Sequence, residues 1–446
     1  MVPKKIHKFE YMERVDIKLY TAVSSPRLEY VAGVVLRDLL GLSFQVVTDR
    51  RKIGNSPFLN YSAERLPEAF NVKPEGILSE TGIRADDPPA ASDGGLMLLF
   101  PSDSPSDLPF DIFAASFWML TRYEEYRKFG PDRHGRFMAE DSLAFRLGFL
   151  RIPVVELWAR RLALALLKKI PFLAFRRNRF RSVVTFDIDQ AYAYRGKGVL
   201  RGAAGFMSDL VKGAGMERLR SLSGTDRDPY DVYDYIFEAV DNAGAEALFF
   251  LPFGSWSEYD RNNPAGSKIY GELVRRITSR YNAGIHFSYN SGHDGSLMKK
   301  ERERFARVTG IVPSVSRQHY LVLRFPDTCR WLHANGIKTD YTLGYPSLPG
   351  FRAGISVPFR FYDLVAEKET ALVMSPFAIM DVTLKDYMKL DVQKAKSVIT
   401  ETADSLVVTG GVFLSIWHNS SLTERNGWEG WREVFEHTLL IGSGND

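Results

Sequence analysis

Apolar and polar positions follow two different rhythms along this chain. In the first part, short strand-like apolar runs alternate with segments whose apolar residues recur at helical spacing. The expected strands lie at 14–23, 43–49 and 96–103, and the expected helices at 27–41, 111–126 and 154–170. Gly41 closes the first helix, Asp111 caps the second and Pro171 follows the third. The pattern predicts a small α/β domain at residues 1–172.

From residue 173 onward, apolar strands are separated by longer helices. The expected strands lie at 182–187, 246–252, 282–287, 314–323, 338–345, 371–378 and 410–418. Clear helical patterns at 296–308, 326–336 and 383–406 fall between several of them. This alternation predicts a deformed (β/α) barrel of about seven strands at residues 173–446. A doubly wound open sheet is the alternative architecture.

Composition and charge narrow the functional classes. The 446 residues are 45% hydrophobic and 25% charged, as in ordinary soluble domains. The net charge is only +4 and the densest basic run, 176–181, precedes a strand, so no nucleic-acid partner is expected. One cysteine, Cys329, leaves no intrachain disulfide and no cysteine-rich zinc site. No signal segment or membrane span is apparent, so the cytoplasm is the expected location. The oligomeric state stays open.

Residues suited to metal binding and acid–base chemistry occur at the ends of the predicted strands. In a (β/α) barrel, the loops at the carboxyl ends of the strands line one open face. Three of the eight histidines of the chain fall at these ends. The residues concerned are Asp187, Asp189, His286, Arg317, His319, Arg352, Asp381, His418 and Asn419. We therefore expect these side chains to converge on one rim.

The acids Asp187 and Asp189 carry the strongest signal. Side chains alternate along a strand, so both acids share a face if the strand runs through them. Two ionised carboxylates at close range repel each other, and a cation relieves the conflict. One acid would bind the metal and the other would take a proton from water. Carboxylate and imidazole ligands suit a divalent metal, with Zn²⁺ the commonest choice.

Several motifs in order resemble one known family. They lie at 185–198 ("TFDIDQAYAYRGKG"), 284–291 ("GIHFSYNS"), 316–354 ("SRQHYLVL…GFRAG"), 380–384 ("MDVTL") and 417–419 ("WHN"). "TFDID" is similar to the TFDD signature of the polysaccharide deacetylases, the NodB-homology family of carbohydrate esterases. The ordered set resembles a divergent branch of that family. Residues 110–126 and "DRHGRF" at 132–137 resemble the extra N-terminal domain of unknown function in that branch.

The resemblance implies a role for each matching position. Asp187 would be the general base, and Arg352 would steady it, although "FRAGI" lacks the usual proline and tyrosine of that motif. His418 would be the general acid that protonates the departing amine, supported by Asp381. The reaction would be metal-assisted hydrolysis of an acetyl group.

The metal ligands implied by the resemblance are Asp189 and His286. The second histidine of the family's metal motif is missing here, because Asn290 stands four residues after His286. An asparagine oxygen is a poor zinc ligand, so His319 or His293 is the expected alternative to Asn290 as third ligand.

The substrate side is represented by three residues. Trp256 and Tyr259 lie in a strand-to-helix loop and could stack on a sugar, or simply pack the loop. Arg317 could contact substrate, and both Arg317 and Arg352 could instead form structural ion pairs. The predicted function is a metal-dependent hydrolase that removes acetyl groups from an N- or O-acetylated glycan or its precursor. The alternatives are a catalytically weakened carbohydrate-binding module on the same barrel and a hydrolase of another non-peptide C–N bond.

Overall fold

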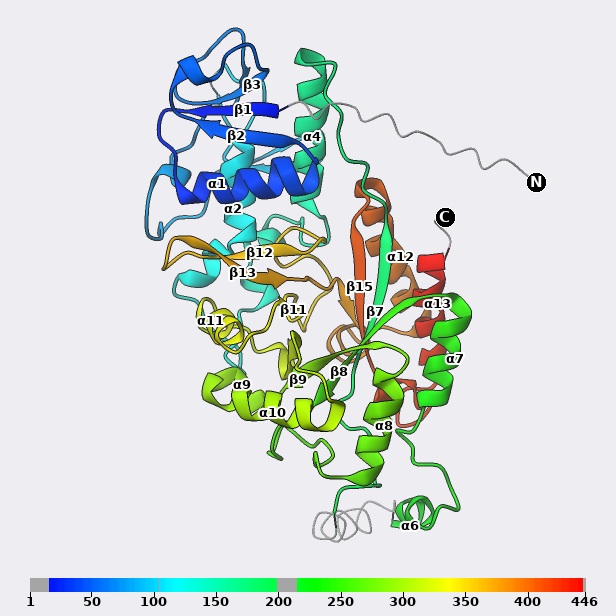
Figure 1. The fold of residues 1–446 in the computed structure, drawn as a ribbon. Coiled ribbons are helices and arrows are strands. Elements are labelled where there is room, and N and C mark those ends of the chain that lie inside the picture. The colour runs from blue at the N-terminus through cyan, green and yellow to red at the C-terminus, as the bar shows by residue number, and fades with distance from the viewer. Residues whose placement is uncertain (1–15, 104, 199–214, 444–446) are drawn as a thin grey trace, which may run out of the picture. The chain divides into compact units, whose positions relative to one another are not determined.

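The computed structural model of the protein describes residues 16–103, 105–198 and 215–443 (Figure 1). The chain divides into two compact units. Unit 1 takes in Met1–Thr81, Pro88–Phe117 and Trp158–Arg177. Unit 2 takes in Gly82–Asp87, Trp118–Leu157 and Asn178–Asp446. Each unit is thus assembled from separate stretches of sequence, and the domain boundary expected between residues 172 and 173 stays a prediction.

Unit 1 is built on a four-stranded parallel sheet. Its strand order is β2-β1-β3-β4, formed by β2 (Ser43–Val47), β1 (Asp16–Thr21), β3 (Phe58–Tyr61) and β4 (Phe70–Asn71). The first two predicted strands are confirmed as β1 and β2, with residues 14 and 15 outside the described part of the chain. The third is β6 (Leu96–Leu99), which pairs antiparallel with β5 (Ala90–Asp93).

The predicted helices of the first part are also present. The first begins as α1 (Pro26–Ala32) and continues as a π-helical stretch, η1 (Gly33–Leu39). Its start follows from Ser25, whose side chain accepts a hydrogen bond from the backbone N–H of Leu28. The other two are α2 (Ile112–Leu120) and α4 (Val154–Lys169).

Unit 2 contains a nine-stranded sheet with the order β12-β13-β11-β10-β9-β8-β7-β15-β14. All neighbours are parallel except β12 and β13, which pair antiparallel. The strands are β7 (Arg181–Asp187), β8 (Glu246–Pro252), β9 (Asn282–Phe287), β10 (Val315–Gln318), β11 (Thr339–Asp340), β12 (Phe359–Asp363), β13 (Lys368–Met374), β14 (Ile379–Met380) and β15 (Val412–His418). Figure 1 shows β15, β7, β8 and β9 running side by side.

The α/β class with a parallel sheet is confirmed, whereas a closed barrel is not. Seven of the nine strands match the predicted ones, and the added strands are β12 and the two-residue β14. These two form the ends of the sheet, and no pairing between them occurs within the described residues, so the sheet is open. Antiparallel β12 occupies the edge where a barrel would continue with a parallel strand.

A short helix of unit 2, α3 (Leu143–Arg146), precedes its nine strands. The later helices lie between the strands in sequence, except the last one, which follows β15. They are α6 (Gly215–Ser223), α7 (Tyr233–Ala243), α8 (Lys268–Thr278), α9 (Tyr289–His293), α10 (Met298–Thr309), α11 (Asp327–Ala334), α12 (Val392–Thr409) and α13 (Trp431–Ser443). The helix predicted at 383–406 is divided into a π-helical turn, η8 (Thr383–Tyr387), and α12. The break has a local cause, because Lys389 has a φ of 56° and Asp391 caps α12. In the described parts of the chain, no helix is long and apolar enough to cross a membrane.

The apolar core fixes where polar groups can emerge. In β7 every residue from Val183 to Asp187 is buried, as expected for a central parallel strand covered on both faces. Parallel strands end at the same edge, so the first polar side chains after each apolar run become neighbours. The register of the sheet pairs His418 with Asp187 and His286 with Arg317.

Candidate metal and hydrolytic site

The carboxyl ends of the central strands of unit 2 bring most of the predicted polar residues together. Asp187 ends β7 and His418 ends β15 in matching register. His286 lies one residue before the end of β9, and His319 directly follows β10. Asp189 lies beyond the last residue of β7, in a bend rather than in the strand. The shared edge of the sheet, not the alternation within β7, places both acids near His286.

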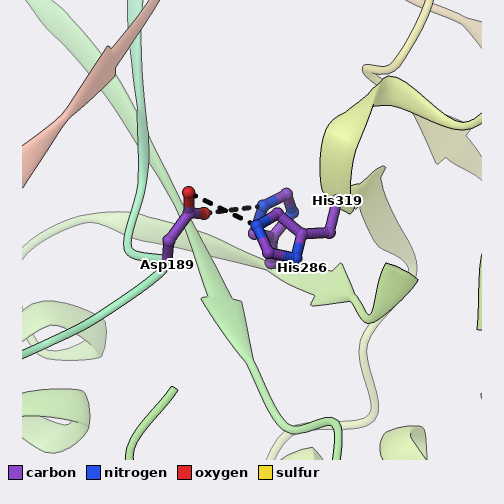
Figure 2. A group of neighbouring side chains, drawn as sticks. All are labelled: Asp189, His286 and His319. Atoms are coloured by element: carbon purple, nitrogen blue, oxygen red, sulfur yellow. Dashed lines mark hydrogen bonds and ion pairs between the residues drawn. The ribbon is translucent and has the colours of Figure 1, made fainter. Parts of the chain in front are cut away.

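Three residues at this edge lie close enough to hold one metal ion. Potential ligand atoms of Asp189, His286 and His319 all lie within 4.8 Å of one another. Figure 2 shows the carboxylate of Asp189 directed toward both imidazoles. Its Oδ1 lies 3.1 Å from Nε2 of His286, and its Oδ2 lies 3.4 Å from Nε2 of His319. One carboxylate and two imidazoles form a donor set that Zn²⁺ and similar divalent metals accept.

Hydrogen bonds from the far side of each ring orient the two imidazoles. Nδ1 of His286 lies 3.1 Å from the backbone carbonyl oxygen of Arg317, which can only accept. Nδ1 of His319 lies 2.8 Å from the carboxylate of Asp260. Both Nδ1 atoms therefore donate, which leaves Nε2 of each ring facing Asp189. Metal-binding histidines usually have such an outer partner, so the residues present fit a divalent metal.

The electrostatics also favour positive charge at this point. Burial acts to raise the pKa of Asp189, but the charges of His319 and His418 and the hydrogen bonds of the imidazoles hold it well below its usual value. Burial likewise acts to lower the pKa of His319, yet the carboxylates of Asp189 and Asp260 raise it to about 10. The surrounding carboxylates thus favour a positive charge between these groups.

Asp187 lies beside the three potential ligands and is held by an arginine. Its Oδ2 is 3.9 Å from Nε2 of His286, and its Oδ1 accepts a hydrogen bond of 2.7 Å from Nη1 of Arg317. The same Nη1 donates to Thr185 at 2.8 Å, and Nε of Arg317 donates to the carbonyl of Tyr341 at 3.0 Å. The fully buried guanidinium therefore fixes the position of Asp187.

Arg352, the arginine expected beside the base, lies elsewhere in unit 2. Its guanidinium donates to both carboxylate oxygens of Glu125, at 2.9 and 2.5 Å, and to the carbonyl of Gly344 at 3.1 Å. Arg122 also pairs with Glu125 at 2.7 Å. A buried carboxylate needs such cationic partners. Arg352 therefore belongs to a buried ion cluster around Glu125, and the arginine that contacts Asp187 is Arg317.

His418 forms a pair with Asp381 on the other side of Asp189. Nδ1 of His418 lies 2.8 Å from Oδ1 of Asp381, whose Oδ2 accepts the backbone N–H of His418 at 2.8 Å. Nε2 of His418 is 3.7 Å from Oδ2 of Asp189. Burial acts to lower the pKa of His418, but the carboxylates of Asp381 and Asp189 raise it to about 10. The ring is oriented and holds its proton.

An open, polar hollow lies in front of these groups. Its lining residues are Asp189, Gln190, Glu258, Tyr259, Arg261, His319 and Tyr320. Tyr259, expected to contact substrate, is among them, whereas Trp256 is not part of the described lining and is 56% exposed. Asn290 is exposed on α9 and is absent from the described lining of both this hollow and the cavity around His286.

Asp260 was missed by the sequence analysis. Besides His319, its carboxylate accepts the backbone N–H of Tyr289 at 2.8 Å and the hydroxyl of Ser257 at 2.8 Å. It lies in the same loop as Trp256 and Tyr259. An acid next to these aromatic residues was the sequence signal that could have identified it. Its partner His319 follows β10, so only the folded sheet shows which histidine it orients.

One family profile matches the N-terminal part of this chain. The sequence profile of a family of unknown function, DUF7033, matches residues 17–171, which is less than half of the chain. No match was found among curated proteins.

Solved structures with a low level of similarity to this chain include two polysaccharide deacetylases and one amylase. A Mycobacterium smegmatis protein assigned as a polysaccharide deacetylase is 17% identical, with a TM-score of 0.40 and coverage of 61% of this chain and 87% of that chain. A Bacillus cereus polysaccharide deacetylase is 13% identical, with a TM-score of 0.29 and coverage of 60% and 87%. The α-amylase AmyC of Thermotoga maritima is 7% identical, with a TM-score of 0.32 and coverage of 60% and 71%. At these levels the likeness carries no argument about function.

Proposed function

We propose that the protein is a metal-dependent hydrolase that removes acetyl groups from an N- or O-acetylated glycan or glycan precursor. The observation that carries this proposal is the convergence of three sets of residues at one sheet edge. These sets are Asp189 with two imidazoles, Asp187 with Arg317, and His418 with Asp381. The ordered motifs that resemble polysaccharide deacetylases support the choice of reaction and substrate class.

Asp189, His286 and His319 would hold the metal ion, with Zn²⁺ as the first choice. When bound, such an ion polarises a carbonyl oxygen and lowers the pKa of water. The outer hydrogen bonds from the rings to Arg317 and Asp260 keep both Nε2 atoms available as ligands.

Asp187 and His418 would move the protons. In hydrolysis, water adds to the acetyl carbon, the C–N or C–O bond breaks, and acetate and an amine or alcohol leave. Asp187, fixed by Arg317, would accept a proton from the attacking water. His418 carries a proton and is oriented by Asp381, so it would give that proton to the departing nitrogen or oxygen. Arg317 thereby takes the supporting role that the sequence motif implied for Arg352.

The hollow in front of Asp189 would accept the sugar. Tyr259 and Tyr320 supply aromatic surface, and Gln190, Glu258 and Arg261 supply polar groups that can bond hydroxyls. Since the hollow is open to solvent, it suits a polar substrate rather than an apolar one.

Metal content and acetate release together test the proposal. Protein stripped with a chelator is reloaded with Zn²⁺, Mn²⁺ or Co²⁺ and supplied with N- and O-acetylated oligosaccharides. We expect about one metal ion per chain and acetate release that depends on it. Glycan binding without acetate release would favour the binding-module alternative, and activity only on small amides would favour the other C–N hydrolase. A chain that neither retains a divalent metal nor releases acetate would contradict the proposal.

A further inference from the structure

The chain makes a strained turn directly after His319. Tyr320 and Leu321 have φ values of 57° and 56°, in the left-handed region that residues with a Cβ avoid. Two successive residues in this region persist only where their surroundings impose the conformation. Because the turn starts at the residue next to His319, it constrains the backbone segment that carries this imidazole.

One contact that supports the turn comes from a distant part of the sequence. Nη1 of Arg136 donates a hydrogen bond of 2.6 Å to the carbonyl oxygen of Tyr320, 184 residues later in the chain. Arg136 is buried, with 5% of its side chain exposed, and Asp132 fixes its guanidinium at 2.7 Å. Both residues belong to unit 2 although they precede its first strand in the sheet.

The segment 132–136 is a loop with internal hydrogen bonds, and it contacts the turn in two places. One carboxylate oxygen of Asp132 accepts the backbone N–H groups of His134 and Arg136, at 2.8 and 2.9 Å. The loop folds back through Gly135, which has a φ of 77°. The second contact is made by the ring of His134, which packs on the ring of Tyr320 with centroids 4.9 Å apart.

We infer that the segment 132–136 is a positioning element of the metal site, with Arg136 as its principal residue. Arg136 holds the strained turn in the one conformation that directs Nε2 of His319 toward Asp189, while Asp260 fixes the rotation of the ring. This inference rests on the proposed metal-dependent function. It gives a purpose to the motif "DRHGRF", which lies within the region matched by the family of unknown function.

The test measures metal affinity rather than turnover. The variants are Arg136→Gln, Arg136→Lys and, as a matched control, Arg151→Gln, which removes an exposed ion pair with Glu401 in the same stretch of unit 2. The Zn²⁺ dissociation constant is obtained by competition with a chromophoric chelator, and the visible spectrum of bound Co²⁺ reports the ligand geometry.

We expect Arg136→Gln to weaken Zn²⁺ binding by about tenfold and to change the Co²⁺ spectrum. Arg136→Lys should recover part of the affinity, because an ammonium can still donate to the carbonyl of Tyr320. Arg151→Gln should match the wild type. Thermal unfolding of the metal-free variants should stay within a few degrees of the wild type.

Three outcomes would overturn the inference. Wild-type affinity and spectrum in Arg136→Gln would do so, as would a lysine variant no better than the glutamine variant. The third is that Arg136→Gln loses metal only because it loses the fold. In that case Asp132→Asn is the milder variant, and unchanged Zn²⁺ affinity in it would also overturn the inference. A wild-type chain that binds no metal would instead overturn the proposed function itself.

Discussion

The two units both end parallel strands in polar residues, yet they use those residues differently. In unit 1, Asn71 ends β4. Its side-chain oxygen accepts the backbone N–H of Leu66, and its side-chain nitrogen donates to the carbonyl oxygens of Leu66 and Ala69. At the end of β3, the hydroxyl of Tyr61 donates to buried Asp111 at 2.7 Å. These polar atoms are committed to their neighbours.

In unit 2, polar atoms from several strand ends converge on one carboxylate. Nε2 atoms of His286, His319 and His418 lie 3.1, 3.4 and 3.7 Å from the carboxylate of Asp189, whose side chain is 33% exposed. The Nδ1 atoms of the same three rings form hydrogen bonds with other groups of the protein. A polar strand end therefore becomes a candidate site when potential ligand atoms from several strands converge on one point, not merely when polar residues occur there.

Replacement of the proposed base should give the largest effect. Asp187→Asn keeps the shape of the side chain but removes its ability to accept a proton, so kcat should fall by roughly 10²–10⁴-fold. Bound metal should remain, because Asp187 is not among the three potential ligands. Acetate release and metal content are measured on the same preparation. The matched control is Asp111→Asn in unit 1, which should alter neither quantity in folded protein. A kcat within a few-fold of wild type in Asp187→Asn would remove Asp187 from the mechanism.

Replacement of the carboxylate ligand should abolish metal retention. In Asp189→Asn the charge between the imidazoles is lost and only a weak amide oxygen remains, so Zn²⁺ affinity should fall by at least about 100-fold. Elemental analysis after dialysis and chelator competition measure the change. If Asp189→Asn bound Zn²⁺ as tightly as wild type, the metal would have to lie elsewhere.

Weakening the outer partner of His319 should have a smaller effect. Asp260→Asn retains the volume but makes the acceptor of Nδ1 neutral, and Zn²⁺ affinity should drop by about 10–100-fold. Asp294→Asn, which alters a fully exposed helix cap, is the matched control and should leave affinity unchanged. Equal affinity in the two variants would show that Asp260 serves only the loop.

A buried acid outside the candidate site should affect only the stability of the fold and leave metal binding unchanged. Glu156 accepts the backbone N–H and hydroxyl of Ser356, at 2.6 and 2.7 Å, and burial raises its pKa from 4.5 to about 7. The folded state thus binds this proton more tightly than the unfolded state, so the contribution of Glu156 to stability is greatest below pH 4.5 and is lost as the pH rises toward 7.

Glu156→Gln should remove this loss of stability at higher pH. We expect the variant to be more stable than wild type at pH 8 by up to about 3 kcal/mol and similar to it at pH 4.5, with unchanged metal content. Urea unfolding at the two pH values gives the comparison. An identical pH dependence in the variant would show that Glu156 does not ionise in this range.

Much of unit 2 could be predicted because its strands are buried runs of apolar residues. The run before Asp187 and the histidine that ends β15 were visible in the sequence, and both lie at the expected edge. Strand β14 was missed because two residues carry no periodicity, and β12 was also absent from the predicted strands. An open sheet rather than a closed barrel follows from these two edge strands.

The partners of the candidate site residues were harder to predict. Sequence order alone cannot decide whether Arg317 or Arg352 reaches Asp187, because the answer depends on which buried carboxylate each arginine meets. Nor does it reveal the contact between Arg136 and Tyr320, which joins residues from distant parts of the chain. Such pairings are set by tertiary packing.

Crystals grown with Zn²⁺ and measured on both sides of the zinc absorption edge give the sharpest check of the metal site. An anomalous peak bounded by the carboxylate of Asp189 and the Nε2 atoms of His286 and His319 is the expected result. A peak bound to other side chains, or none beside Asp189 at a Zn²⁺ concentration that saturates the protein in solution, would contradict it.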